Sequence, residues 1–311
     1  MLIFKGMLHK DLISIHDLKP TEIEQILTLA AKLKKKPLSN LLHGKSLAMI
    51  FEKPSTRTRV SFEVGMFELG GTTIHLSPNA VQLGVRESIA DVARTLSRYV
   101  DGVMLRTFSH EMLVEFAKWA SVPVINGLSD LSHPCQALAD IFTIKEHKKL
   151  KNIKIAYVGD GNNVCHSLML ICAKMGINLA VATPKGYEPK FEIIRLAKTD
   201  AKQSKAVIEV INDPRVAVRN ADVIYTDVWA SMGQEEESAA RKKIFKDYQV
   251  NKSLVKLANK EALILHCLPA HRGEEITADV IEGPSSVVFD QAENRLHVQK
   301  AVLALLLGGK K

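Results

Sequence analysis

Hydrophobic residues fall into short apolar runs that alternate, from one end of the chain to the other, with segments of helical periodicity. The short runs predict strands at Leu47–Phe51, Thr72–Leu76, Gly102–Leu105, Pro123–Ile125, Ile153–Val158, Leu179–Ala182, Val223–Thr226, Ala262–His266 and Val287–Phe289. Helices are predicted between them, for example at Glu87–Tyr99, Glu111–Ala120, Pro134–His147, Cys165–Met175 and Lys190–Thr199. Strands that alternate with helices indicate βαβ units, in which helices cover both faces of a parallel sheet.

A chain of 311 residues suits one large α/β unit or two domains. The lysine-rich, strand-free stretch Lys145–Asn152 lies close to the middle and predicts a boundary there, between a domain 1–148 and a domain 149–311. The amphipathic segment Glu293–Leu307 predicts a last helix that packs back on the first domain. The predicted fold is therefore α/β, with two domains that are each a parallel sheet flanked by helices and are joined by bridging helices.

The formal net charge is +8, yet the lysines are scattered and form no basic stripe interleaved with aromatic residues. This distribution argues against a nucleic-acid partner and favours anionic small molecules. Four cysteines show no metal-ligand spacing, so we expect reduced thiols and no metal. The first residues lack the apolar core of a signal peptide, and the longest apolar stretch, Ala301–Leu307, is too short to span a bilayer. We expect a cytoplasmic protein with no membrane partner.

The segment "STRTR" follows the first predicted strand and opens a helix. Unpaired backbone N–H groups at a helix N-terminus favour anions, Ser55, Thr56 and Thr58 add hydroxyl groups, and Arg57 can grip a phosphate in two places. The alternative is a Ser/Thr helix cap followed by a solvated basic turn. Arg59 lies one residue further into the helix, and we predict that it pairs with Glu52 or Glu63.

Two more polar groups of the first half are candidates for the same site. Arg106 follows a predicted strand, where ligands of parallel sheets bind, although a surface arginine would fit the sequence as well. In "HPCQ", Pro134 suits the first turn of a helix, which places His133 at the N-cap and Gln136 one turn on. Both can donate hydrogen bonds to an oxygen that gains charge, while a capping or core histidine is the other interpretation.

Polar residues also follow strands of the second half. "GDGNNV" lacks the third glycine of a dinucleotide loop, and no acidic residue ends the next strand, so an Asn163 that faces a substrate is favoured over NAD binding. Asp227 and Ser231 lie beyond a strand end, where Asp227 can pair with an ammonium group. Cys267 follows another strand end and is either a small buried residue or a site thiol. Arg295 offers a further anion or carbonyl contact.

Together these segments resemble the transcarbamylases, and within them the ornithine carbamoyltransferase branch. The resemblance covers nearly the whole chain and rests on seven features in the family's order: "STRTR", "LRTF", "HPCQ", "DGNN", "DVWASMG", "HCLP" and a late Arg295. "SMG" and the cysteine of "HCLP" are what resemble the ornithine branch. The resemblance implies an enzyme that transfers the carbamoyl group of carbamoyl phosphate to the δ-amine of L-ornithine, giving L-citrulline and phosphate.

The resemblance also implies roles for individual residues. It places the active site between the domains, with Arg106, His133, Cys267 and Asp227 as catalytic residues. Carbamoyl phosphate would be bound by Ser55, Thr56, Arg57, Thr58, Gln82, Arg106, His133, Gln136, Cys267, Leu268 (through its backbone) and Arg295. Ornithine would be bound by Asn163, Asp227, Ser231 and Met232.

In the family Gln82 reaches into a neighbouring subunit's site, which implies a homotrimer or a multiple of trimers. The loop reads Val85-Arg86-Glu87-Ser88, where many members carry an Arg-Gly-Glu run. No cofactor, metal or covalent intermediate is expected. A carbamoyltransferase with aspartate, putrescine or an acylated ornithine as acceptor is the alternative.

Overall fold

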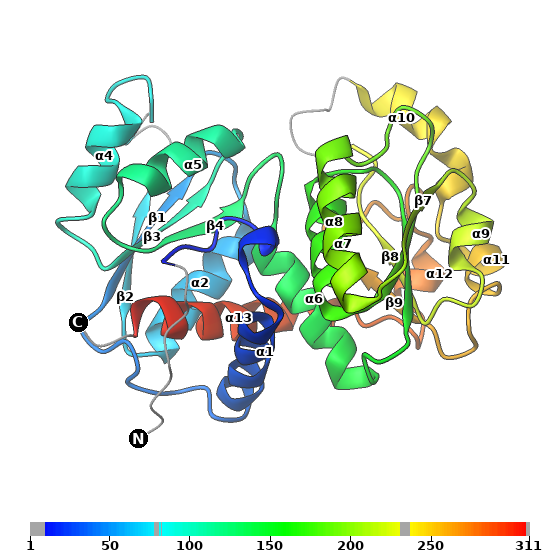
Figure 1. Cartoon of the computed structure of the whole chain (residues 1–311), viewed down its shortest axis with the longest axis horizontal. Coiled ribbons are helices and arrows are strands. Elements are labelled where there is room, and N and C mark those ends of the chain that lie inside the picture. The colour runs from blue at the N-terminus through cyan, green and yellow to red at the C-terminus, as the bar shows by residue number, and fades with distance from the viewer. Residues whose placement is uncertain (1–9, 78–80, 82, 231–236, 309–311) are drawn as a thin grey trace. The chain divides into compact units, whose positions relative to one another are not determined.

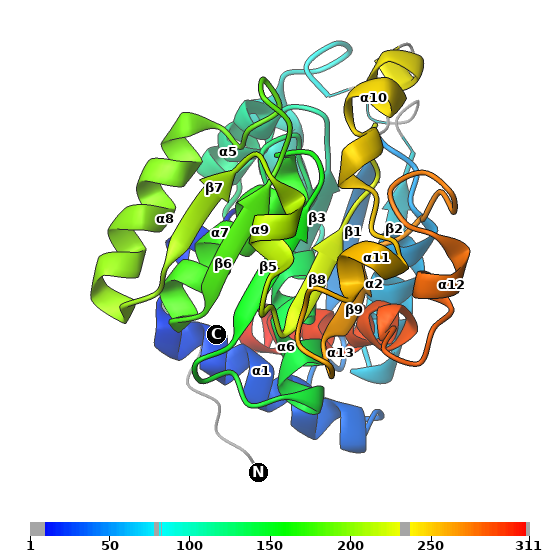
Figure 2. The ribbon, with the colours of Figure 1, turned by 90° about the vertical axis from the view of Figure 1, so that its right-hand side faces the viewer.

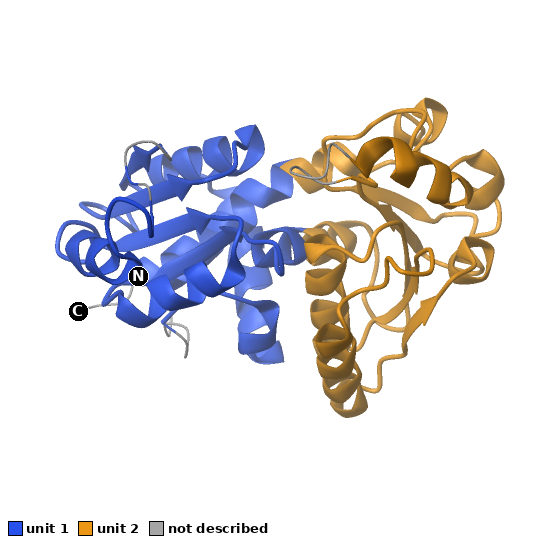
Figure 3. Ribbon diagram, turned by 90° about the horizontal axis from the view of Figure 1, so that it is seen from above, with its two compact units in different colours: residues 1–139, 293–311 blue, residues 140–292 orange. Residues whose placement is uncertain are grey.

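The chain divides into two compact units, residues 1–139 with 293–311, and residues 140–292 (Figure 3). The structure is a computed structural model and describes residues 10–77, 81, 83–230 and 237–308. The chain leaves the first unit within helix α6 (Pro134–His147) and returns to it within helix α13 (Val288–Leu307). Among the described residues, none of the helices combines the length and the apolar character needed to cross a membrane.

The first unit is built on a four-stranded parallel sheet with the strand order β2-β1-β3-β4. Its strands are β1 (Ser46–Phe51), β2 (Thr72–Leu76), β3 (Gly102–Arg106) and β4 (Val124–Leu128). Its helices are α1 (Pro20–Lys35), α2 (Thr56–Glu68), α4 (Ile89–Leu96) and α5 (His110–Trp119), preceded by the short helix η1 (Ile15–Asp17). Helices α4 and α5 cover one face of the sheet, and α1, α2 and the end of α13 lie on the other (Figure 1).

The second unit is built on a five-stranded parallel sheet with the order β7-β6-β5-β8-β9, seen side by side in Figure 2. Its strands are β5 (Lys154–Val158), β6 (Asn178–Ala182), β7 (Ile208–Ile211), β8 (Val223–Thr226) and β9 (Leu263–His266). Its helices are α7 (Asn163–Met175), α8 (Phe191–Ser204), α9 (Pro214–Val218), α10 (Ser238–Ile244), η3 (Lys246–Tyr248), α11 (Lys252–Val255) and α12 (Ala278–Ile281). Helices α7 and α8 lie on one face, and α9, α11 and α12 on the other.

The pattern of burial explains why the apolar runs form strands at these places. Strands β1, β3 and β8 are buried almost throughout, because helices remove both faces of each sheet from water. Helix starts follow capping residues: Ser88, Ser109 and Asn162 accept backbone N–H groups of α4, α5 and α7. The predicted fold class of two helix-flanked parallel sheets is therefore confirmed.

One predicted strand is wrong, and one strand of the structure was not predicted. The apolar triplet Val287–Phe289 is not a strand, since α13 begins at Val288 and the neighbouring Ser286 forms only an isolated bridge with Ile264. Strand β7 was not predicted, although its short apolar run contains the required β-branched residues. The last helix also begins earlier than the predicted Glu293, so Arg295 lies in its second turn. Short apolar runs do not by themselves distinguish a buried helix start from a strand.

Candidate active site

The register of the first sheet brings two of the predicted anion-binding segments together. Phe51, the last residue of β1, is paired with Arg106, the last residue of β3. Because the strands are parallel, the turn that follows β1 and the side chain of Arg106 lie at the same edge of the sheet. The backbone N–H of Glu52 donates a hydrogen bond to the carbonyl of Arg106 at 2.8 Å, which continues this pairing beyond the strands.

The turn formed by Ser55–Thr58 is the capped start of helix α2, and it is only partly exposed to solvent. The hydroxyl of Ser55 accepts a hydrogen bond from the backbone N–H of Thr58 at 3.2 Å, which makes Ser55 the N-cap of α2. Thr56 is exposed and Arg57 half-buried, whereas Thr58 is buried. The cap interpretation is thus correct for Ser55, while the buried Thr58 and the partly buried Arg57 are not the solvated turn of the alternative.

Arg59 has the structural role that its position predicts. Its Nε donates to Glu63 Oε1 at 3.0 Å across one turn of α2, and both side chains are partly exposed. Glu52 instead accepts the backbone N–H of Phe108 at 2.9 Å. The predicted pairing is therefore confirmed with Glu63.

A buried polar group lies behind this turn. Arg295 donates from one Nη to Gln136 Oε1 at 2.7 Å and from the other to Thr58 Oγ1 at 3.2 Å. The carbonyl of His133 accepts the backbone N–H groups of Gln136 and Ala137, so His133 occupies the N-cap position predicted from its sequence. The structure thereby groups Thr58, His133, Gln136 and Arg295, which lie far apart in the sequence.

The electrostatics of this group favour an anion. Burial, and then the positive charges of Arg295, Arg106 and Arg57, hold the pKa of His133 well below its usual range. His133 is therefore neutral at pH 7 and can donate a hydrogen bond without carrying charge. Three guanidinium groups whose charges act on one buried imidazole create a positive potential that a phosphate ester would offset.

In the second unit, sheet register again gathers the candidate residues. Val158 of β5 is paired with Thr226 of β8, and Thr226 with His266 of β9. The segments that follow these three strands contain Asn163, Asp227 and Cys267, so all three leave the sheet at the same edge.

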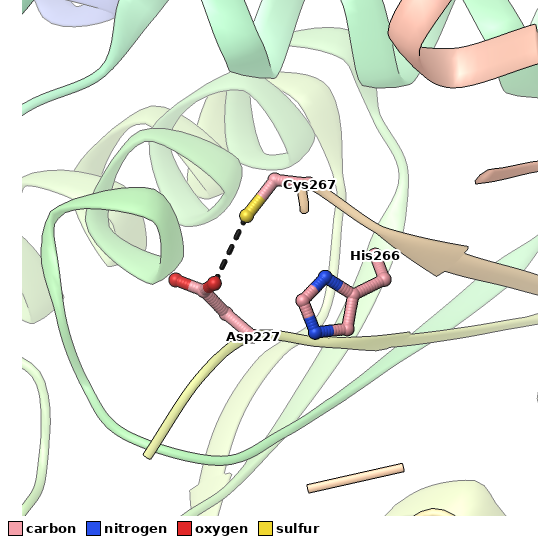
Figure 4. A group of neighbouring side chains, drawn as sticks. All are labelled: Asp227, His266 and Cys267. Carbon is pink, nitrogen blue, oxygen red and sulfur yellow. Dashed lines mark hydrogen bonds between the residues drawn. The ribbon is translucent and has the colours of Figure 1, made fainter. Parts of the chain in front are cut away.

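The carboxylate of Asp227 is the centre of this second group. Its Oδ1 accepts the thiol of Cys267 at 3.0 Å, shown by the dashed line in Figure 4, and the backbone N–H of Val228 at 2.8 Å. Its Oδ2 accepts Nδ2 of Asn162 at 2.8 Å. These bonds hold a buried carboxylate in one orientation at the end of β8.

Asn162 was not among the predicted site residues. Its side-chain carbonyl caps α7 by accepting the N–H groups of Val164 and Cys165, while its amide donates to Asp227. The local signal for the cap was its place just before a helical segment, but its bond to Asp227 spans 65 positions. Asn163, which was predicted, is the first residue of α7 and is half-buried.

An ion pair lies beside Asp227 and was also missed. Arg241 contacts Asp160 at 3.1 Å and donates to the carbonyl of Trp229 at 2.9 Å. Burial raises the pKa of Asp160 to about 6, an effect that Arg241 counteracts and that the charge of Asp227 reinforces. Arg241 thereby holds the segment that follows Asp227 against the loop that follows β5.

Two groups of potential metal ligands occur among the described residues, although the sequence showed no such spacing. In the first, ligand atoms of Asp227, His266 and Cys267 lie within 4.8 Å of one another (Figure 4). However, Nδ1 of His266 accepts the backbone N–H of Leu268 at 2.8 Å, and Nε2 lies 3.0 Å from Glu275. Since both ring nitrogens already have partners, a metal would have to replace one of these bonds. The second group, His271, Glu274 and Glu275, includes the carboxylate that holds His266.

The remaining predicted residues differ in what the structure shows of them. Leu268 follows Cys267 with a backbone φ of +57°, and its N–H is held by His266. Gln82, Ser231 and Met232 lie outside the described residues. For all the site residues, contact with a substrate stays a prediction.

Family models match both halves of the chain. Residues 10–146 match the carbamoyl-P binding domain of the aspartate/ornithine carbamoyltransferases, and residues 151–306 match their Asp/Orn binding domain. The chain belongs to the aspartate/ornithine carbamoyltransferase family. The family to which the sequence motifs pointed is thereby confirmed.

Known members of the aspartate/ornithine carbamoyltransferase family resemble the chain over nearly its full length. It is 58% identical to an ornithine carbamoyltransferase of Pyrococcus horikoshii over 308 residues, which covers 97% of each chain. It is 56% identical to the Bacillus subtilis ornithine carbamoyltransferase over 299 residues, which covers 96% of this chain and 94% of the relative. The solved ornithine carbamoyltransferase of Pyrococcus furiosus matches 99% of this chain and 100% of its own at 56% identity, with a TM-score of 0.96.

Proposed function

We propose that this chain transfers the carbamoyl group of carbamoyl phosphate to the δ-amine of L-ornithine, giving L-citrulline and phosphate in arginine biosynthesis. The observation that carries this proposal is the grouping of Arg295 with Gln136 and Thr58, beside a His133 that the charges of Arg295, Arg106 and Arg57 help to keep neutral. That arrangement suits an acyl phosphate, whose phosphate is joined to a carbonyl carbon, and Arg57, Arg106 and His133 lie within the residues that match the carbamoyl-P binding domain. The ornithine carbamoyltransferases of Pyrococcus furiosus and Campylobacter jejuni are both described as anabolic.

In this proposal, the residues around His133 and Arg295 and the residues around Asp227 bind different substrates. The first domain, residues 1–148, would bind carbamoyl phosphate, and the second domain, residues 149–311, would bind ornithine. Phosphate contacts come from Ser55, Thr56, Arg57, Thr58 and Arg106, and contacts to the carbamoyl group from Arg106, His133, Gln136, Cys267, Leu268 and Arg295. Ornithine contacts come from Asn163, Asp227, Ser231 and Met232.

Bond formation in this reaction requires a neutral amine. The δ-nitrogen attacks the carbamoyl carbon, and negative charge develops on the carbonyl oxygen of the tetrahedral intermediate. Arg106, His133 and Thr58 donate hydrogen bonds to this oxygen. The C–O bond to phosphate then breaks, the phosphate keeps the electron pair and remains on the turn at Ser55–Thr58, and it takes up the proton that the attacking nitrogen loses. Orientation and preorganised positive charge can each contribute several kcal/mol to such a step.

The rate is expected to rise with pH between about 6 and 9, because the ammonium form of ornithine has no lone pair with which to attack. His133 does not set this dependence. Its pKa lies well below 6.5, so its ring is already neutral throughout this range and gains no charge until the pH falls further. Citrulline formation measured from pH 6 to 9 at saturating carbamoyl phosphate tests this expectation. A flat profile with chemistry rate-limiting would contradict it.

The acceptor is tested by supplying carbamoyl phosphate with each candidate amine in turn. L-ornithine should react far faster than aspartate, putrescine or acetylornithine, since the chain is 56–58% identical to ornithine carbamoyltransferases. Asp227 can pair with the α-ammonium of ornithine, which acetylation removes. Colorimetric detection of the carbamoylated product separates the four acceptors. Equal or greater activity with any of the other three amines would refute the ornithine assignment and leave the family unchanged.

We further propose a homotrimer, or a multiple of trimers, in which Gln82 of one subunit reaches the site of the next. Helix α2 supports an association of this kind, since Val60, Val64 and Phe67 are exposed on it at a spacing of one turn each. Exposed apolar side chains that line one face of a helix mark a surface for a partner. Light scattering after size-exclusion chromatography tests the assembly, and a monomeric mass would contradict it.

A cytoplasmic location is also proposed. All four cysteines lie within the described residues and are free thiols, as expected in a reducing compartment. Fractionation of cells that express the chain, with detection in the soluble cytoplasmic or the membrane fraction, tests this location.

A further inference from the structure

Gln299, a fully buried residue of α13, contacts one of the proposed ligand-binding arginines. Its Oε1 accepts a hydrogen bond from Nε of Arg295 at 2.9 Å, one helical turn away. The two Nη atoms of the same guanidinium donate to Gln136 and Thr58. All three nitrogens of Arg295 therefore have a buried side-chain acceptor, which fixes the plane of the guanidinium group.

The amide of Gln299 continues this contact to the turn at the start of α2. Its Nε2 donates to Ser61 Oγ at 2.8 Å, and the hydroxyl of Ser61 in turn donates to the carbonyl of Arg57 at 2.6 Å. The orientation of the amide follows from its partners, because a guanidinium can only donate and the single proton of Ser61 is directed to Arg57. Gln299 is thus bonded at one end to Arg295 and at the other to the first turn of α2.

A close approach of the two helices makes this arrangement possible. At Gly65, a Cβ atom would lie 3.2 Å from Cγ of Lys300, which is tighter than an ordinary van der Waals contact. The glycine lets α2 and α13 pack closely enough for Ser61 to reach Gln299 on one side of Gly65 and for Glu68 to pair with Lys300 on the other. The position of Gln299 relative to α2 is consequently fixed by packing as well as by hydrogen bonds.

We propose that Gln299 is a positioning residue for carbamoyl phosphate, which holds the guanidinium of Arg295 and the first turn of α2, including Arg57 and Thr58, in one fixed arrangement. The inference rests on the proposed function, since it assumes that Arg295 and this turn bind that substrate. Without Gln299, the guanidinium loses its Nε acceptor and can turn about its long side chain. Binding must then include the cost of ordering Arg295, which weakens the affinity for carbamoyl phosphate.

The test compares Gln299→Leu with Gln299→Glu in steady-state kinetics and in calorimetric titration with carbamoyl phosphate. Leucine keeps much of the volume but cannot accept from Arg295, so KM and Kd for carbamoyl phosphate should rise about tenfold, with KM for ornithine unchanged. Glutamate still accepts from Arg295 and can keep a bond to α2 by accepting the proton of the Ser61 hydroxyl, so its values should stay within about threefold of the wild type. Ser61→Ala, which removes the link to α2 with little loss of volume, should give an intermediate rise.

A matched control separates positioning from a general loss of packing. Leu307→Ala alters a buried residue two turns further along α13, which packs beside Gly102 at the start of β3. It should lower the melting temperature and leave both KM values unchanged. The inference fails alone if the wild type binds and turns over carbamoyl phosphate while Gln299→Leu and Ser61→Ala match it, or if Leu307→Ala raises this KM equally. A wild type that neither binds nor turns over carbamoyl phosphate overturns the proposed function together with the inference.

Discussion

Replacing Arg57 with alanine should lower kcat/KM for carbamoyl phosphate about a thousandfold, because the variant loses a charged donor to the phosphate in both the ground state and the transition state. Arg57 lies in the first turn of α2, directly after the Ser55 cap, and its charge is among those that hold the pKa of His133 low. No other side chain of this turn carries a positive charge toward the buried group, since Arg59 is paired with Glu63. Citrulline formation over a range of carbamoyl phosphate concentrations measures the loss.

Arg59→Ala is the matched control for this variant, since it removes the same type of side chain two positions away in the same helix. Its ion pair is partly exposed and contributes at most about 1 kcal/mol, so both stability and activity should stay close to those of the wild type. Circular dichroism and melting temperature verify that both variants fold. Full activity of Arg57→Ala, or an equal loss in Arg59→Ala, would contradict the assignment of Arg57 to the phosphate.

The second large effect is expected at Asp227. Asp227→Asn keeps the shape of the side chain and removes its charge, so KM for ornithine should rise about a hundredfold or more, as expected when one partner of a buried charged pair is lost. KM for carbamoyl phosphate should change little, because the side-chain oxygen of asparagine can still accept the thiol of Cys267, the proposed carbamoyl contact that Asp227 holds. Initial rates with each substrate varied in turn separate the two constants.

Asp279→Asn serves as the control in the same unit. Asp279 lies near the surface at the start of α12 and pairs with Lys252, so its neutralisation should affect neither constant. An Asp227→Asn variant that retains the wild-type KM for ornithine would show that another residue pairs with the α-ammonium group of ornithine. Equal increases in both KM values would indicate a general distortion of the fold.

Local pattern was sufficient for most of the fold. Runs such as Leu47–Phe51 and Val223–Thr226 were recognised as strands because burial on both faces demands continuous apolar residues. The errors have a common cause. The run Val287–Phe289 begins a helix, while Ile208–Ile211 forms an edge strand, and length and composition alone do not separate these cases.

For the candidate site, the sequence by itself determined which polar side chains lie at the ends of the strands and which family the chain belongs to. Ser55 at a helix start, Arg106 at the end of β3 and Asp227 after β8 are each visible from a strand or helix end at or next to them. Such positions are predictable because the carboxyl ends of parallel strands form a shared binding edge.

Only the tertiary structure decided which residues hold these groups in place. Asn162 meets Asp227 across 65 positions, and Arg295 meets Gln136 across 159 and Thr58 across 237. Gln299 and Ser61, separated by 238 positions, have no motif of their own and form a pair because α2 and α13 pack closely at Gly65. Partners of this kind depend on sheet register and helix packing, which arise from the folding of the whole unit and not from the residues that adjoin each site residue along the chain.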